Sequence, residues 1–385
     1  MLWLEADRLL DGARDRPHEP GTLAIEGERI ALHHRRPGPA DVALSLRGCT
    51  LLPGLIDFHS HLGVDTRRAD LGTQVRVPPP QYLANGIARI QEDFRAGVTT
   101  LRLCGDHHRV DLALRREIRD GRIAGPRLLV AGRAIRSPRG SGGAVASVLT
   151  DDPDAISQAA QENLDAGVDF VKLFVSGGVG DPSRAPTECY FGEAHVAAAV
   201  RRAHDAGRPV AAHLVGGSGV AAAVGGGLDV IEHGWFLTEA DLDLVARAGT
   251  LLTLTLGVLC GPHGHAFGED PEQHARLRRL GERALETARR VIARRLRYVV
   301  GTDAVHGCLA DELRWLVALG ETPLRAIQAA TAWPAAALGL GETLGTLVPG
   351  KIADVVAVEG DPLEDIEAMT KIRLVVSQGR VVYVR

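Results

Sequence analysis

The sequence predicts an α/β protein, a (β/α)8 barrel with a small β-sandwich domain built from both ends of the chain. Eight short apolar runs recur between residues 51 and 304, with polar loops and helical stretches between them. Continuous apolar strands that alternate with helices are typical of a parallel sheet covered on both faces. The two chain ends instead show alternating strands separated by glycine turns, and chain termini often lie close together.

This change of pattern predicts the domain boundaries. Residues 1–52 and 343–385 form the β-sandwich domain, and residues 53–342 form the barrel. The barrel strands are expected within 51–61, 97–104, 126–132, 167–177, 208–214, 227–234, 249–256 and 296–304. Helices are expected at 82–97, 154–167, 192–207 and 238–249, and each ends in Ala-Gly, where glycine favours a helix C-cap. An open doubly wound sheet is the competing fold, and the lack of GxGxxG after the first strand weakens it.

Composition limits the class of protein. Of the 385 residues, 45% are hydrophobic and 24% charged, so the chain has enough apolar material to bury a core. The net charge is −4 and no basic block stands out, which argues against nucleic acid as a partner. No apolar run reaches 18 residues and no secretory leader is recognised, so we expect no membrane partner and a cytoplasmic location. The oligomeric state is left open, with a homo-oligomer among the options.

Polar side chains occur within or at the C-terminal ends of several otherwise apolar strands. They are His59 and His61 on the first run, Lys172 in the fourth, and His213, His233 and Asp303 on the fifth, sixth and eighth. In a (β/α)8 barrel, functional residues collect at the C-terminal ends of the strands. His59 and His61 are two residues apart, so both imidazoles point to the same side and can share one metal ion. Four histidines and an aspartate at one rim therefore predict a metal centre.

Lys172 is one of only three lysines among 44 basic residues, and it lies in the apolar stretch 170–175. Burial there would lower its pKa and favour the neutral amine. A neutral amine can react with carbon dioxide to form a carbamate, an anionic ligand that bridges two metal ions and that arginine cannot form. A lysine whose ammonium group reaches solvent is the alternative. We expect the carbamate on Lys172.

Seven stretches of the sequence carry a resemblance to a known family: LLPGLIDFHSHLG, AGVTTLR, FVKLFVSGG, AGRPVAAHL, DVIEHG, GTDA and TAWPAAALGLGETLGTLVPGKIADVVAVEGDPLEDI. They are similar to the amidohydrolase superfamily, in its imidazolonepropionase-like and Xaa-Pro dipeptidase-like branch, over nearly the whole chain. The resemblance implies a binuclear metal site with a carboxylated lysine. It assigns His59, His61 and Asp303 to one metal ion, His213 and His233 to the other, and the carboxylated Lys172 and a hydroxide to the bridge.

Imidazole and carboxylate ligands suit two divalent ions, Zn best, with Mn, Fe or Co as alternatives. Two such ions would activate the bridging water, and Asp303 would act as the catalytic base that takes its proton. The resemblance thus implies a metal-dependent hydrolase that cleaves an amide or peptide C–N bond. Gly216 stands where mononuclear deaminases of the superfamily carry a glutamate, which favours hydrolysis over deamination. A hydrolase that opens a cyclic amide or lactone, and an inactive metal-binding paralogue, are the alternatives.

An arginine-rich loop suggests the charge of the substrate. Arginines at 133, 136 and 139 follow the third strand, and such a loop could hold a carboxylate bidentately. We therefore expect a small substrate with a free carboxylate. The substrate-binding candidates are Arg136, Arg139, His107, His306 and Tyr190. Each of them could equally be an ordinary surface side chain of a rim loop.

Overall fold

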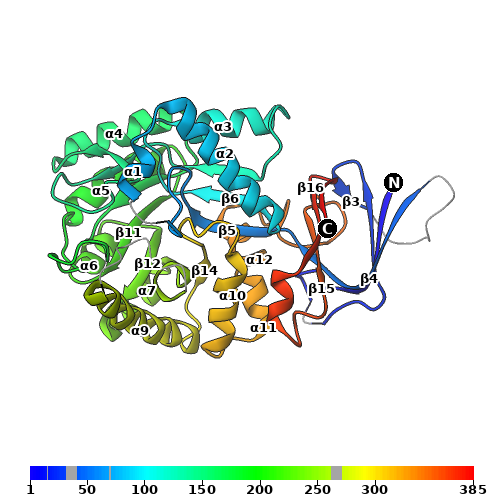
Figure 1. Ribbon diagram of the computed structural model, residues 1–385. Helices are drawn as coiled ribbons and strands as arrows, with labels where there is room; N and C mark the ends of the chain where they lie inside the picture. The colour runs from blue at the N-terminus through cyan, green and yellow to red at the C-terminus, as the bar shows by residue number, and fades with distance from the viewer. Residues whose placement is uncertain (15, 32–40, 69–70, 262–270) are drawn as a thin grey trace. The chain divides into compact units, whose positions relative to one another are not determined.

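The computed structural model describes residues 1–14, 16–31, 41–68, 71–261 and 271–385. The chain divides into two compact units. Unit 1 comprises Met1–Asp57, Gln91–Thr100 and Gly307–Arg385, and unit 2 comprises Phe58–Ile90 and Leu101–His306. The predicted α/β fold is confirmed, because parallel strands alternate with helices and both chain ends contribute to a mixed sheet (Figure 1). The domain boundaries at 52/53 and 342/343 stay a prediction.

The mixed sheet has the strand order β17-β16-β15-β4-β1-β2-β3. Its strands are β1 (Leu2–Leu9), β2 (Gly21–Glu26), β3 (Arg29–Ile30), β4 (Val42–Pro53), β15 (Val355–Glu359), β16 (Ile372–Ser377) and β17 (Arg380–Val384). β1 and β4 run parallel, whereas β4 and β15 run antiparallel. Alternate residues of these strands, such as Leu4, Leu51 and Leu374, share one apolar cluster. The two chain ends are therefore held together by burial of a common face.

The parallel strands are found in all eight predicted runs. They are β5 (Leu55–Ser60), β6 (Val98–Leu103), β7 (Arg127–Val130), β10 (Val171–Phe174), β11 (Val210–Gly216), β12 (Val230–Phe236), β13 (Leu251–Leu254) and β14 (Tyr298–Val300). Two backbone hydrogen bonds link the ends of the sheets into a ring, from Asp303 N to His59 O at 2.8 Å and from Asp169 N to Val130 O at 2.9 Å. Two short strands, β8 (Ala134–Arg136) and β9 (Ala146–Leu149), extend the sheet beside β10.

The helices lie between the strands along the chain. They are α1 (Leu71–Val75), α2 (Pro79–Arg95), α3 (Val110–Arg119), α4 (Pro153–Asp165), α5 (Glu193–Asp205), α6 (Gly219–Gly225), α7 (Glu239–Ala248), α8 (Gly257–Cys260), α9 (Pro271–Ala293), α10 (Leu309–Ala318), α11 (Pro323–Gln328), α12 (Ala332–Ala337) and a 3-10 helix (Ile366–Thr370). The four predicted helices are α2, α4, α5 and α7. Each is followed by a glycine with a φ between 65° and 90°, at positions 97, 167, 207 and 249. The predicted glycine ends are therefore confirmed.

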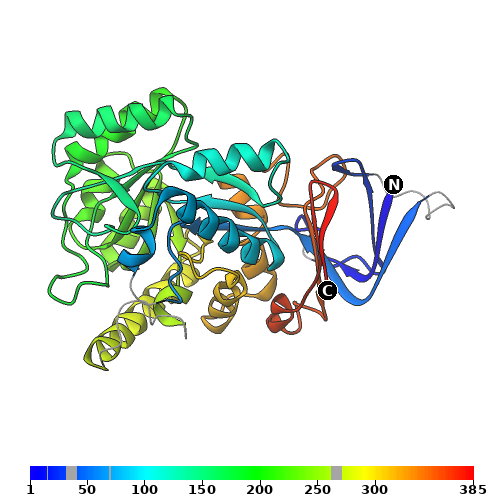
Figure 2. The same ribbon diagram turned by 45° about the horizontal axis from the view of Figure 1, so that its top comes forward.

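Helices cover the outer side of the parallel strands in unit 2. In both views, α4 and α5 lie outside β10 and β11 (Figures 1 and 2). Every residue of β10 and β12 is buried, whereas β7 alternates buried and half-buried residues. In the described part of the chain, no helix combines the length and the apolar character needed to cross a membrane. The cytoplasmic location stays a prediction.

Candidate metal centre

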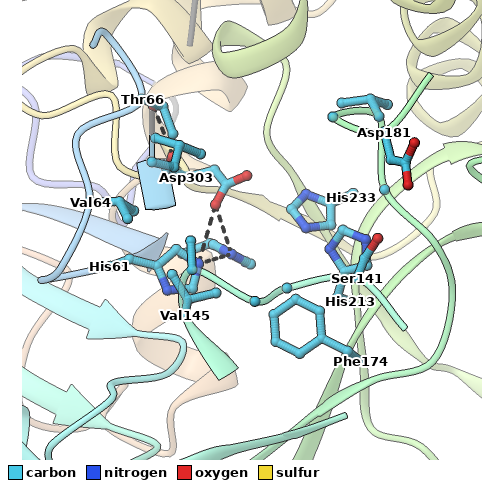
Figure 3. Close-up of a pocket in the computed structure, with 18 of the residues that line it drawn as sticks. His61, Val64, Thr66, Ser141, Val145, Phe174, Asp181, His213, His233 and Asp303 are labelled. Atoms are coloured by element: carbon cyan, nitrogen blue, oxygen red, sulfur yellow. Dashed lines mark hydrogen bonds and ion pairs between the residues drawn. The ribbon is translucent and has the colours of Figure 1, made fainter. Parts of the chain in front are cut away.

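Six side chains singled out from the sequence meet in one pocket of unit 2. They are His59, His61, Lys172, His213, His233 and Asp303, and all of them line the pocket. Figure 3 shows His61 and Asp303 on one side, with His213 and His233 facing them across the cavity. The side chains converge because parallel strands begin at one edge of the sheet and end at the other, so residues at their carboxyl ends become neighbours.

Three donor atoms form a compact triangle at the end of β5. Nε2 of His59 and Nε2 of His61 lie 3.3 Å apart, and Oδ1 of Asp303 lies 3.3 Å from each of them. A tetrahedral zinc ion with bonds of about 2.0 Å has ligand atoms about 3.3 Å apart. The spacing therefore fits a single metal ion held by these three residues, which form a candidate metal-binding group.

His213 and His233 form a second pair of imidazoles beside the triangle. Their ring centroids are 4.6 Å apart, and the centroid of His233 lies 4.9 Å from that of His59. Nε2 of His213 is 2.7 Å from the carbonyl oxygen of Gly177, so Nδ1 is its available nitrogen. Nδ1 of His233 is 2.7 Å from Oγ1 of Thr255, so Nε2 is its available nitrogen. Each ring thus keeps one nitrogen for a ligand.

Lys172 is completely buried, and its Nζ has no hydrogen-bond partner among the described residues. A buried polar nitrogen without a hydrogen-bond partner is costly, so a modification or a ligand that supplies partners is favoured at this position. A carbamate would give the side chain two oxygen atoms that can coordinate metal ions. The unpartnered nitrogen therefore fits the predicted carbamate, which stays a proposal.

Burial favours the neutral form of three of the four imidazoles. It lowers the pKa of His61 and lowers the pKa of His213 to about 4. Burial and the neighbouring His213 hold the pKa of His233 well below its ordinary value. A histidine binds a metal ion through its neutral imidazole, so these three rings are prepared as ligands.

The pKa values of Asp303 and His59 are both shifted in the direction that favours positive charge between the two side chains. Burial opposes ionisation of Asp303, but the charge and hydrogen bonds of His59 and the hydrogen bond of His61 hold the pKa of that carboxyl well below its usual range. Burial also opposes protonation of His59, yet neighbouring anionic groups, among them Glu232 and Asp303, raise its pKa well above the ordinary value. Positive charge is therefore stabilised at this position, whether a proton or a metal ion supplies it.

Two of the ligand candidates have strained backbones. His233 has a φ of 78° and Asp303 a φ of 51°, in the region that non-glycine residues rarely adopt. Such strain persists only where surrounding contacts hold it, and it concentrates at functional sites.

The pocket above these residues has a volume of about 200 Å³, which suits a small molecule. Its walls are largely apolar and comprise Val64, Leu71, Val145, Phe174, Val179 and Trp235. The loop at residues 141–145 forms one side, and residues 178–181 form another. A reacting bond at the metal centre would therefore lie at the floor of a mostly apolar cavity.

The predicted substrate-binding residues lie outside the set that lines this pocket. Arg139 is 68% exposed and pairs with Asp151, while Nε2 of His306 contacts the carbonyl oxygen of Val64. Tyr190 donates to Glu188, and His107 lines a separate shallow pocket.

Arg136 lies directly behind the pocket wall. Its Nη1 donates to Gly140 O at 2.8 Å, its Nε is buried without a partner, and its Nη2 lies 3.7 Å from the position that a Cβ on Gly143 would take. Gly143 lines the pocket, so Arg136 lies nearer to it than Arg139 does. The substrate-binding roles stay predictions.

Sequence reasoning missed several residues of the site. Trp235 and Val179 line the pocket, and Glu232 contacts Nδ1 of His59, the ring nitrogen outside the donor triangle. A carboxylate inside the apolar run DVIEHG was a usable signal for Glu232, since buried charges need partners. No comparable signal existed for Val179, because its place depends on the path of the long loop after β10.

A ring of parallel strands with imidazoles, a lysine and a carboxylate at its carboxyl edge defines the class, a barrel hydrolase built around a metal-binding group. The Amidohydrolase family model matches residues 50–382, and the chain belongs to this family. It is therefore a hydrolase that acts on carbon–nitrogen bonds.

Individual relatives agree with this assignment. Ochratoxinase from Aspergillus niger is 29% identical over 348 residues, covering 82% of this chain and 72% of the relative. Imidazolonepropionase from Rhodococcus jostii is 27% identical over 354 residues, covering 83% and 76%. The crystal structure of a Xaa-Pro dipeptidase with bound methionine in the active site superimposes with a TM-score of 0.90 at 28% identity, covering 100% of both chains.

Proposed function

We propose that this chain hydrolyses an amide or peptide bond of a small substrate at a binuclear metal centre. The observation that carries the proposal is the triangle of donor atoms from His59, His61 and Asp303 at the floor of the pocket. His213, His233 and the carbamate of Lys172 would complete the centre. Zn²⁺ is the ion that suits these donors best, with Mn, Fe or Co as alternatives.

Different groups in the pocket would have different roles in hydrolysis. Bound metal ions would lower the pKa of a water molecule to near neutrality and polarise the carbonyl group of the substrate. Asp303 is 19% exposed and ionised, so its second oxygen can take a proton from that water and return it to the leaving nitrogen. The apolar walls exclude bulk water and hold the groups that flank the scissile bond.

The substrate that we propose carries a free carboxylate. Methionine, bound in the active site of the similar Xaa-Pro dipeptidase, is an amino acid of this kind. In this chain, Arg136 is the arginine that could reach such a group, because its Nε has no partner and its Nη2 lies beside Gly143, which lines the pocket. A bidentate pair with Arg136 would orient the substrate.

Ring opening is the second candidate reaction. Imidazolonepropionase is among the relatives, and a cyclic amide uses the same water and the same base. An inactive paralogue is disfavoured, since Asp303 is present and placed against both histidines.

The decisive experiment combines metal analysis with a substrate panel. The purified protein is assayed for metal content, then stripped with a chelator and reloaded with Zn²⁺, Mn²⁺ or Co²⁺. Turnover is measured on dipeptides, N-acyl amino acids, cyclic amides and lactones. We expect about two metal ions per chain, and turnover of a linear amide that disappears on stripping and returns on reloading. Activity that survives complete stripping would overturn the proposal.

A further inference from the structure

A buried carboxylate lies on the far side of His59 from the donor triangle. Oε2 of Glu232 is 2.7 Å from Nδ1 of His59, while Nε2 of the same imidazole belongs to the triangle. Glu232 is fully buried and His59 is 1% exposed. Nδ1 therefore donates its hydrogen to the carboxylate, and Nε2 is the nitrogen that faces the proposed metal site.

Arg102 neutralises this carboxylate and fixes its position. Nη1 of Arg102 donates to Oε1 of Glu232 at 2.7 Å and to the carbonyl oxygen of Phe58 at 3.0 Å. The guanidinium also lies over the ring of Phe170, 3.7 Å from its centroid. Arg102 is only 2% exposed, so the pair is closed off from water and its geometry is rigid.

The same place does not suit a metal ion of its own. His59, Cys104 and Glu232 bring their ligand atoms within 4.8 Å of one another, which on distance alone is a second candidate metal group. However, Nη1 of Arg102 lies 3.2 Å from the sulfur of Cys104 and 2.7 Å from Glu232. The guanidinium already supplies the positive charge there, so the role of Glu232 is directed at His59.

The other imidazoles have weaker partners. His213 and His233 contact the neutral oxygens of Gly177 and Thr255, and Nδ1 of His61 is 3.5 Å from the carbonyl oxygen of Gly105. Among these four imidazoles, His59 is the one whose nitrogen on the side away from the proposed metal ion contacts a carboxylate. A carboxylate acceptor fixes the tautomer and increases the basicity of a ligating imidazole.

We propose that Glu232, held by Arg102, is a positioning residue that strengthens metal binding at the site of His59, His61 and Asp303. This inference rests on the metal centre proposed above. Loss of Glu232 should therefore weaken metal binding, while loss of other buried carboxylates in unit 2 should not.

The test measures metal affinity directly. Metal-free wild type and Glu232→Gln are titrated with Zn²⁺ against a competing chelator, and the melting temperature of each metal-free protein is recorded. We expect Zn²⁺ affinity to fall about 10- to 100-fold in Glu232→Gln. An affinity within twofold of wild type in a folded variant would overturn the proposal.

In Glu232→Gln the buried Arg102 loses its charged partner, which could unfold the protein. A second variant addresses this case. Arg102→Met with Glu232→Gln removes both buried charges and keeps an amide oxygen as acceptor for His59. Replacing a buried ion pair together is far better tolerated than breaking it. This double variant should melt close to wild type without metal and still bind Zn²⁺ at least 10-fold more weakly. Wild-type affinity in it would also overturn the proposal.

Asp111→Asn is the matched control. Asp111 is a fully buried carboxylate of unit 2 that accepts hydrogen bonds from the backbone N–H groups of Leu112 and Gly132. Burial and the nearby Asp106 raise its pKa to about 7, so an amide is a mild change. Its Zn²⁺ affinity should equal that of wild type, and a loss as large as in Glu232→Gln would overturn the specific role. A wild type that binds no Zn²⁺ would refute the metal centre itself, whereas normal wild-type binding with an unaffected Glu232→Gln refutes only the positioning role.

Discussion

Phe174 stacks on His213, with ring centroids 5.1 Å apart and planes inclined by only 19°. The two residues are direct partners in the parallel pairing of β10 with β11. The phenyl ring therefore fixes the plane of an imidazole that we assign to the metal centre. Its other neighbour is the pocket loop, since a Cβ on Gly142 would lie 2.4 Å from Cε1 of Phe174.

Gly142→Ala should impair the site through Phe174. The residue has a φ of 89°, which alanine adopts at a cost of about 1–2 kcal/mol, and the new methyl group would push Phe174 off His213. We expect the melting temperature to fall by a few degrees and kcat/KM to fall about tenfold or more. Thermal melting and steady-state kinetics measure both effects.

Gly143→Ala provides the control, because this residue also lines the pocket. The nearest atom to its added Cβ is Nη2 of Arg136 at 3.7 Å, which is an ordinary contact, and its φ is not in the left-handed region. Its melting temperature and its metal content should stay near those of wild type. Equal damage in both variants would show that Phe174 does not transmit the effect.

Lys172→Ala should lose at least one metal ion and most of the activity. The lost bridge removes part of a centre that supplies several kcal/mol, so kcat/KM should fall about 100-fold or more. Short carboxylic acids should restore part of the activity by replacing the carbamate, whereas excess carbon dioxide should not. Lys371→Ala, an exposed lysine of unit 1, is the control. Full metal content in Lys172→Ala would refute the carbamate.

Asp303→Asn should separate metal binding from proton transfer. The amide keeps an oxygen beside His59 and His61, so the protein should fold and retain at least one metal ion. Without a carboxylate to take the proton, turnover should fall about 100-fold or more. Metal analysis and kcat are measured on the same preparation. Near-normal turnover would place the base elsewhere.

The stability of the metal-free protein should fall as the pH is lowered from about 6.5 to about 4. In this range the unfolded chain binds protons on histidines whose ordinary pKa is 6.5, while folded His213 does so only near its pKa of about 4. More protons in the unfolded state mean that acid favours unfolding. Urea unfolding at several pH values should show this slope, and His213→Gln should flatten it. An unchanged slope in His213→Gln would contradict the shift.

Substrate charge can be tested on one scaffold, by comparing an N-acyl amino acid with its methyl ester. If Arg136 holds the carboxylate, kcat/KM should be about tenfold higher for the acid, which corresponds to about 1.4 kcal/mol. The preference should vanish in Arg136→Ala and persist in Arg139→Ala, whose side chain is exposed. Equal values for acid and ester in wild type would remove the carboxylate from the proposed substrate.

The fold and the ligand candidates could be predicted from the sequence because both depend on short-range sequence patterns. Apolar runs, Ala-Gly helix ends and the two-residue spacing of His59 and His61 depend only on neighbours along the chain. The rule that parallel strands end at one edge then brings Lys172, His213 and Asp303 together without further information.

Only the tertiary structure decided which side chains support and surround those ligands. Arg102 and His59 meet Glu232 across 130 and 173 residues of chain, and these contacts depend on how β5, β6 and β12 are arranged in space. The position of Arg136 behind the loop at 141–145 likewise depends on how that loop packs against Phe174. Periodicity sets which face of a strand a residue occupies, but contacts between distant side chains are set by strand register and loop path, which no local pattern encodes.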